Sequence, residues 1–162
     1  QGAGPATASL ETSRALARDL LAEVRVIVSA ERNERQIDLR AALEALCSGI
    51  PTPSIRLTIA GELHITSPSA AHTLFCCVQE AITNAVRHAH ASVIAIDISR
   101  SGDVIVASIA DDGCGRTANG EGNGLAGMRE RLAQHGGSMT AGDAVGRGFR
   151  IDLCLPAAGA AA

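Results

Sequence analysis

The sequence predicts an α/β two-layer sandwich, in which a mixed, mostly antiparallel sheet packs on long helices behind an N-terminal helical segment. Residues 9–34 carry apolar side chains at spacings of three and four, which is typical of a helix. Ser67 and Pro68 suit the start of a second, long helix. Residues 92–99 and 103–110 form two short apolar segments that predict strands joined at a tight turn.

The amino-acid composition alone argues against some classes of function. Hydrophobic residues make up 46% of the 162, enough for a packed core, and no apolar run approaches the roughly 20 residues that span a bilayer. The net charge is -3, Lys, Trp and Tyr are absent, and only 2 Phe are present, so nucleic-acid binding is disfavoured. The chain begins at Gln1 without a signal-peptide pattern, so we interpret it as a fragment of a longer protein.

The 5 cysteines are odd in number and show no CxxC spacing. This pattern argues against a disulfide framework and a structural zinc site, and it fits a reducing, cytoplasmic setting. His72 and Cys76 are four residues apart and could form half of a metal site on one helix face. The favoured interpretation is that Cys76 and Cys77 are small apolar residues of the core.

The N-terminal part is expected to be helical after a disordered lead-in at residues 1–8. The stripe of the helix at 9–34 is apolar and must pack on the domain or on a partner helix; it comprises Leu16, Leu20, Val24, Ile27 and Val28. Residues 38–48 predict a second short helix, with Asp38 as N-cap and Gly49 as its stop. We place a domain boundary after residue 50, so that the helical segment covers 9–50.

The predicted domain spans residues 51–158, followed by a tail at 159–162. A strand around residues 55–59 is expected to turn at Ala60 and Gly61, as in a hairpin. The long helix runs from Ser67 to about Ala89, followed by the two strands and their Ser101–Gly102 turn. A helix from Gly124 ends at Gly136–Gly137, and the chain closes with a turn and an alternating strand at 149–155.

Two segments carry residues suited to chemistry. The long helix places four polar side chains on one side, Glu80, Asn84, Arg87 and His88. Asn84 and Glu80 offer the hard oxygen atoms that Mg²⁺ prefers, and Arg87 can face a phosphate. The alternative is an ordinary solvated helix face.

The second segment is ADDGCGRTANGEGNGLAGMRERL, residues 110–132. Asp111 follows a strand, and its ionised carboxylate would select a ligand edge that donates, such as an exocyclic amine. Gly113 and Gly115 permit close approach of the backbone to a flat ligand. Three further glycines precede and open a helix whose N–H groups favour an anion: Gly122, Gly124 and Gly127. A glycine-rich surface turn is the alternative interpretation.

These segments stand in a characteristic order. "QEAITNAVRHA", "DDGCG" and "GLAGMRERL" are followed by Gly146-x-Gly148 before the last strand. Over about residues 55–156 the chain resembles the ATP-binding (Bergerat) fold of gyrase, Hsp90, histidine kinases and MutL. More narrowly, it looks like the N, G1 and G2 boxes of sensor histidine kinases of the nitrate-sensor and DesK-like subfamily.

The resemblance implies a role for each matched residue. Asn84 would hold Mg²⁺, with Glu80 as a second candidate ligand and catalytic acid, and Asp111 would bind the adenine amine. Residues 116–123 would form an ATP lid. The remaining cofactor-binding positions implied are Arg87, His88, Gly113, Gly115, Gly122, Gly124, Leu125, Gly127, Met128 and Gly148. Phe149 stands where the family usually has Thr, so a hydroxyl that could help hold nucleotide is lost.

The resemblance also implies the reaction. The domain would donate the γ-phosphate of ATP to a histidine on a separate dimerisation hairpin, which would pass it to a response regulator. The first histidine of the chain is His64, so the acceptor is expected before Gln1, and residues 9–34 would be the tail of the hairpin in a homodimer. We expect a cytoplasmic domain, and the sequence leaves open whether the full-length kinase is anchored in a membrane. The alternatives are an anti-sigma-type serine kinase of the same fold and a degenerate interaction module.

Overall fold

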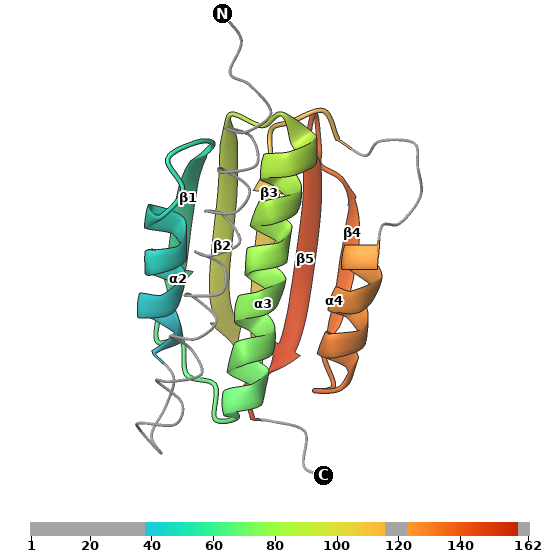
Figure 1. Ribbon diagram of the computed structural model, residues 1–162. Coiled ribbons are helices and arrows are strands. Elements are labelled where there is room, and N and C mark those ends of the chain that lie inside the picture. The colour runs from blue at the N-terminus through green and yellow to red at the C-terminus, as the bar shows by residue number, and fades with distance from the viewer. Residues whose placement is uncertain (1–37, 116–122, 159–162) are drawn as a thin grey trace, which may run out of the picture. The chain divides into compact units, whose positions relative to one another are not determined.

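The computed structural model describes residues 38–115 and 123–158 (Figure 1). The expected lead-in, the helix at 9–34, the tail at 159–162 and all but the last residue of the expected lid lie outside the described residues. Within the part of the chain that is described, no helix is long and apolar enough to cross a membrane.

The centre of the fold is a five-stranded sheet in the order β1-β2-β3-β5-β4. Its strands are β1 (Ser54–Ala60), β2 (Val93–Ser101), β3 (Val104–Asp111), β4 (Ser138–Asp143) and β5 (Phe149–Pro156). The pairing of β1 with β2 is parallel, and the other three pairings are antiparallel. The expected mixed, mostly antiparallel sheet is therefore confirmed.

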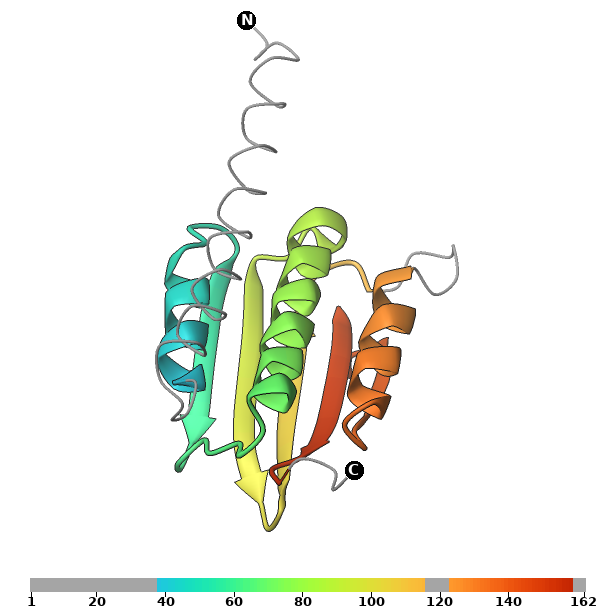
Figure 2. The same ribbon diagram turned by 60° about the horizontal axis from the view of Figure 1, so that its bottom comes forward.

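In the part of the chain that is described, three α-helices are found, and they cover one face of this sheet (Figures 1 and 2). They are α2 (Leu39–Ser48), α3 (Pro68–Asn84) and α4 (Asn123–Ala133). The predicted caps are confirmed, because the Asp38 side chain accepts the Ala41 N–H and the Ser67 side chain accepts the Ala70 N–H. Each cap satisfies an N–H group that a helix start otherwise leaves without a partner.

The core lies between the helices and the inward face of the sheet. The alternate strand residues that face the helices are nearly inaccessible, among them Ile94, Ile96, Ile98, Ile105, Ala107, Ile109, Ile151, Leu153 and Leu155. The helices contribute large buried side chains such as Leu43, Leu74 and Phe75. The apolar stripe of α3 thus meets the alternating pattern of the strands, as the two periodicities require.

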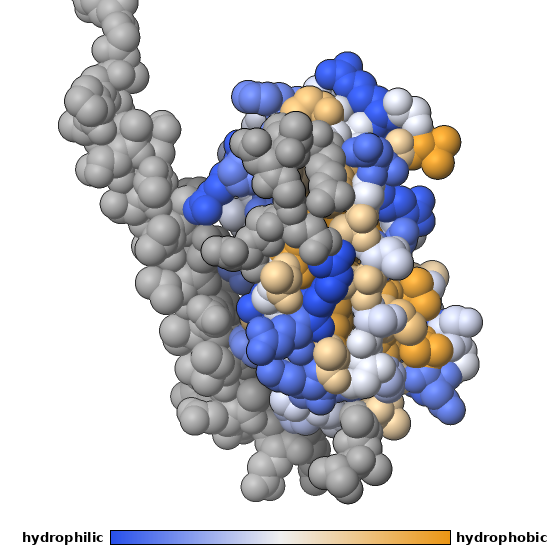
Figure 3. Space-filling view, turned by 90° about the vertical axis from the view of Figure 1, so that its right-hand side faces the viewer, coloured by the Kyte–Doolittle hydropathy of each residue, from blue (hydrophilic) through white to orange (hydrophobic). Residues whose placement is uncertain are grey.

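None of the described helices lies over the opposite face of the sheet (Figure 2). Figure 3, viewed from the side of α4 and β4, shows hydrophilic and hydrophobic surface interspersed. Among the described residues, the exposed large hydrophobic side chains are Val86, Val106 and Val145. Scattered apolar side chains of this kind are ordinary on a protein surface.

The long helix ends in an unusual way. After Asn84 the chain makes a π-helical turn, η1 (Ala85–Ala89), and His90 follows with a left-handed backbone at φ 50°. Such turns are rare and are found frequently at functional sites. The expected helix to about Ala89 is confirmed, but its periodicity gave no sign of the change in winding.

Two features of the fold differ in detail from the predictions. The expected hairpin at Ala60 and Gly61 is wrong, because β1 pairs in parallel with β2 instead of with the segment after it. Strand β4 was not predicted, since SMTAGD has few large apolar residues. Helix α2 belongs to the compact unit Asp38–Ala162, and the division into a helical segment at 9–50 and a domain at 51–158 stays a prediction.

Candidate functional site

Asp111 is the last residue of β3, and its carboxylate is held at the end of the sheet. Oδ1 accepts hydrogen bonds from the Gly113 N–H at 2.9 Å and from the Phe149 N–H at 3.3 Å. Both of these contacts fall on one oxygen, and the side chain is half-buried. The carboxylate is therefore fixed by the backbone through Oδ1, and among the described residues no hydrogen bond to Oδ2 is found, so Oδ2 can accept from a ligand.

Gly113 lies directly against the end of the α3–η1 helix. A Cβ at this position would overlap the backbone and side chain of Ala89, and Gly113 is buried. Beside it, the Cys114 N–H donates to the Ala89 carbonyl at 2.8 Å. The last carbonyls of a helix lack partners within the helix, so this bond satisfies one of them. The expected close approach at Gly113 is made by the protein's own helix.

A third segment, the turn between β4 and β5, contacts the backbone of Asp111. Gly148 is buried with φ 98°, and a Cβ there would overlap the carbonyl group of Asp111. Gly115 also has a left-handed backbone at φ 73°, and its Cβ position lies 3.2 Å from the Gly148 carbonyl oxygen. The absence of side chains at these glycines lets strand ends and turn close on Asp111.

The start of α4 faces the polar stripe of α3. A Cβ on Gly124 would overlap the Glu80 carboxylate and would lie 3.5 Å from the Asn84 amide nitrogen. Gly124 stands in the first turn of α4, where N–H groups and the helix dipole favour an anion. The structure therefore brings Glu80, Asn84 and the start of α4 together.

Other predicted residues take different positions around this point. Arg87 and His88 are exposed on η1, and Leu125 is half-buried near the start of α4. Met128 is fully buried, which places its side chain in the core. Gly127 is half-buried, and its Cβ position lies 3.6 Å from Arg131 Nη1. Gly122 lies outside the described residues.

Two scaffold contacts were missed by the sequence analysis. Asp112 Oδ1 accepts the N–H groups of Ser92 at 2.7 Å and Val93 at 2.9 Å. These two bonds, of which the bond from Val93 has the larger effect, hold the pKa of Asp112 below its usual range. Arg147 Nε donates to the Gly113 carbonyl at 3.1 Å. The only sequence signal for the first contact was a second acid next to Asp111.

The cysteines do not complete a metal site in the part of the chain that is described. His72 Nε2 lies 3.4 Å from Cys76 Sγ, but no group of three His, Cys, Asp or Glu able to hold a metal is found there. Burial raises the pKa of Cys47 and Cys77 to about 11, so both thiols stay protonated at neutral pH. Cys114 is exposed, with Sγ 3.5 Å from the His88 carbonyl oxygen.

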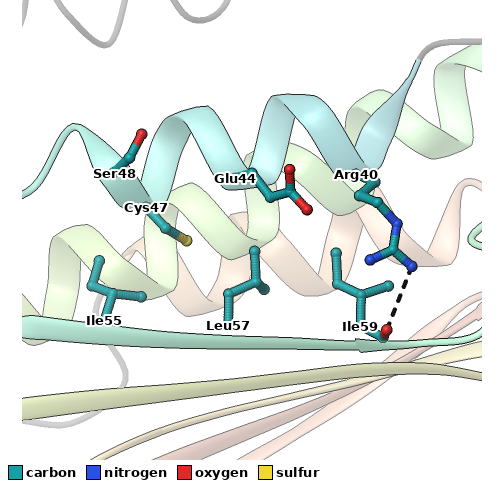
Figure 4. Close-up of a pocket in the computed structure, with 7 residues that line it drawn as sticks. All are labelled: Arg40, Glu44, Cys47, Ser48, Ile55, Leu57 and Ile59. Atoms are coloured by element: carbon teal, nitrogen blue, oxygen red, sulfur yellow. Dashed lines mark hydrogen bonds between the residues drawn. The ribbon is translucent and has the colours of Figure 1, made fainter.

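A cavity of about 300 Å³ lies elsewhere, between α2 and β1 (Figure 4). It is lined by Arg40, Glu44, Cys47, Ser48, Ile55, Leu57 and Ile59. Arg40 closes one end by donating to the Gly61 carbonyl at 2.7 Å. None of the predicted site residues that the structure describes lines this cavity, so the cavity is separate from the contacts around Asp111.

The arrangement matches a known family. The sequence profile of the histidine kinase-, DNA gyrase B- and HSP90-like ATPases matches residues 70–159, more than half of the chain. The chain belongs to this ATPase family. Its members share an ATP-binding domain, so the resemblance seen in the glycine boxes is confirmed at the level of family and nucleotide.

Named relatives of this ATPase domain are sensor histidine kinases. The chain is 36% identical over 146 residues to sensor histidine kinase YxjM of Bacillus subtilis, covering 87% of the chain and 36% of that protein. It is 40% identical over 72 residues to sensor histidine kinase DesK of the same organism, covering 41% of the chain and 19% of DesK. The chain thus spans about a third of the length of the first curated relatives it matches.

Solved structures support the fold. The blue-light activated histidine kinase of Erythrobacter litoralis EL346 superposes with a TM-score of 0.67 at 21% identity. The match covers 96% of this chain and 52% of the EL346 chain. The two-layer sandwich expected from sequence is therefore the fold of histidine kinase catalytic domains.

The turn glycines give a matched test of this geometry. Gly148 and Gly146 both have φ 98°, so alanine strains the backbone equally at both, by about 1–3 kcal/mol. Only at Gly148 would the new Cβ also overlap Asp111; at Gly146 nothing lies within 4 Å. We expect Gly148→Ala to lower the free energy of unfolding by about 2 kcal/mol more than Gly146→Ala in urea titrations. Equal losses in the two variants would contradict the close contact.

Proposed function

We propose that this chain is the ATP-binding catalytic domain of a two-component sensor histidine kinase. It binds Mg-ATP and donates the γ-phosphate to a histidine on a dimerisation hairpin, which transfers it to a response regulator. Family membership and homology to sensor histidine kinases support the proposal. The whole protein is a homodimer in this proposal, and the segment before α2 belongs to its hairpin.

One observation carries the proposal. The start of α4 packs against Glu80 and Asn84 of α3, while the backbone fixes Asp111 at the neighbouring strand end. The site thus offers oxygen ligands and helix N–H groups on one side, and a lone acceptor on the other. These two halves suit the two ends of an adenine nucleotide, its phosphates and its amino group.

The residues present fit a magnesium nucleotide. The Asn84 carboxamide and Glu80 carboxylate are hard oxygen donors, and Mg²⁺ binds through few protein ligands plus phosphate oxygens. Arg87 and His88 are exposed beside them, which leaves both side chains accessible to a phosphate. Bound Mg²⁺ would neutralise phosphate charge. Phosphoryl transfer depends mainly on such positioning and charge neutralisation.

Asp111 gives the most direct test of nucleotide recognition. In Asp111→Asn the amide oxygen can keep the Gly113 and Phe149 hydrogen bonds, but an NH₂ group replaces the oxygen that would accept from adenine. We expect ADP to bind about thirtyfold more weakly in calorimetry with Mg²⁺, the loss of one charge-assisted bond worth about 2 kcal/mol.

The control for this test is Asp103→Asn. Asp103 lies in the β2–β3 turn and pairs with Arg100 at 3.5 Å on the surface, so its loss removes the same charge away from the site. ADP affinity should be unchanged in this variant. If both variants bind ADP as tightly as the original chain, Asp111 does not read adenine.

A second test uses the start of α4. In Gly124→Ala the new methyl group meets Glu80, whose flexible side chain must turn away, while the helix itself is favoured by up to about 1 kcal/mol. We expect undiminished thermal stability with Mg-ADP binding weakened by about tenfold. Gly142→Ala adds the same methyl group on β4, where nothing lies within 4 Å of the new Cβ, and binding should persist. Equal binding by both variants would exclude a role for this contact.

Transfer itself is tested by supplying the receiver. The hairpin of the parent protein, added in trans with Mg-ATP, should acquire a phosphate that is stable in alkali and labile in acid. The same hairpin with its histidine changed to Ala should acquire none. Acid-stable phosphate on a serine would favour an anti-sigma-type kinase instead. Nucleotide binding without any transfer would leave only a binding module.

A further inference from the structure

The second acid of the "DDGCG" segment has no assigned role in the proposed site, although it makes some of the shortest side-chain hydrogen bonds in the described residues. Asp112 Oδ1 accepts Ser92 N–H at 2.7 Å and Val93 N–H at 2.9 Å, and the Asp112 N–H donates to the Val93 carbonyl at 3.2 Å. Three bonds therefore join one residue at the exit of β3 to Val93, the first residue of β2, and to Ser92 just before it. The side chain itself is exposed and is not part of the core.

The residues that Asp112 holds form a very short connection. Helix η1 ends at Ala89, and only His90, Ala91 and Ser92 separate it from β2. His90 has a left-handed backbone at φ 50°, a conformation that costs energy in a residue other than glycine. The Asp112 carboxylate fixes the far end of this connection, so it limits how the helix end can move relative to the strands.

The two residues after Asp112 complete the connection on the helix side. The Gly113 backbone packs against Ala89, and the Cys114 N–H donates to the Ala89 carbonyl. Segment 111–114 is thus fastened both to the end of the helix that carries Asn84 and to the start of β2. Asp111 stands at the beginning of this segment and receives one of its hydrogen bonds from it.

We infer that Asp112 is a positioning residue: its carboxylate clamps the helix–strand connection to the exit of β3 and so aims Asp111 at the nucleotide base relative to Asn84. This inference rests on the proposed function, because it gives Asp111 the role of reading the base. Asp112 itself touches no ligand in this scheme.

The chemistry of the clamp supports this role. A carboxylate that accepts two backbone N–H groups makes stronger and shorter bonds than a neutral acceptor. The same two bonds, with a smaller contribution from the charge of Arg147, lower the pKa of Asp112. The carboxyl group of Asp112 is therefore charged at neutral pH and can accept both N–H groups.

A specificity ratio tests the inference, because a purely structural residue would not change it. ADP presents an amino group to Asp111, whereas inosine diphosphate presents a carbonyl oxygen that the carboxylate repels. Dissociation constants for both nucleotides are measured with Mg²⁺ on the full 162-residue chain and its variants. We expect the original chain to prefer ADP.

In Asp112→Ala the clamp is lost, and Asp111 is no longer held toward the base. ADP binding should weaken by about tenfold with little change for inosine diphosphate, so that the preference falls by about the same factor. Asp112→Asn retains an acceptor oxygen of the same reach and should keep a preference within about threefold of the original. If the Ala variant does not fold, Asp112→Ser, which retains a shorter acceptor, should show an intermediate preference.

The outcomes separate this inference from the proposed function. A folded Ala or Ser variant that keeps the original preference, or that loses affinity for both nucleotides equally, overturns the positioning role alone, provided that Asp111→Asn still abolishes the preference. If the original chain binds neither nucleotide, or does not distinguish them, the proposed base recognition fails and the inference fails with it.

Discussion

The whole site depends on a contact between two backbones, that of Gly113 and Cys114 with the end of the long helix at Ala89. The helix end has carbonyls without helical partners, and the glycine box supplies an N–H group to one of them at 2.8 Å. This contact leaves no room for a side chain at residue 113. Because it joins the helix that bears Asn84 to the strand that bears Asp111, it sets the separation of the two halves of the proposed nucleotide site.

Sheet order then brings the remaining parts to the same place. Strand β5 lies between β3 and β4, so the turn that precedes β5 arrives beside the exit of β3. That turn contributes the Arg147 guanidinium, which donates to the Gly113 carbonyl, and Phe149, the first residue of β5, donates its N–H to Asp111. The residues of the proposed site are therefore held by bonds between segments that are far apart in the chain, and the sheet pairing makes those bonds possible.

Local signals explain which parts the sequence could predict. Periodicity and caps located α3 and the strands β2, β3 and β5, because these features depend on neighbouring residues. The edge strand β4 has small residues and a weak pattern, and the parallel pairing of β1 is decided by a partner beyond the intervening helix α3. In the site, the motifs identified residues suited to a ligand, whereas the contacts of Asp112 with Ser92 and Arg147 with Gly113 span 20 and 34 residues and left no local pattern.

The backbone and the side chain of Phe149 affect the proposed site in separate ways. The family usually has Thr here, and the lost hydroxyl predicted a change in the pocket. In the structure the bond from residue 149 to Asp111 comes from the backbone N–H, so any residue except proline supplies it. The side chain is half-buried and shares the alternation of Ile151 and Leu153, which face the helices. The substitution therefore places an apolar ring where a hydroxyl is usual, on the site's side of the sheet, and leaves the hold on Asp111 intact.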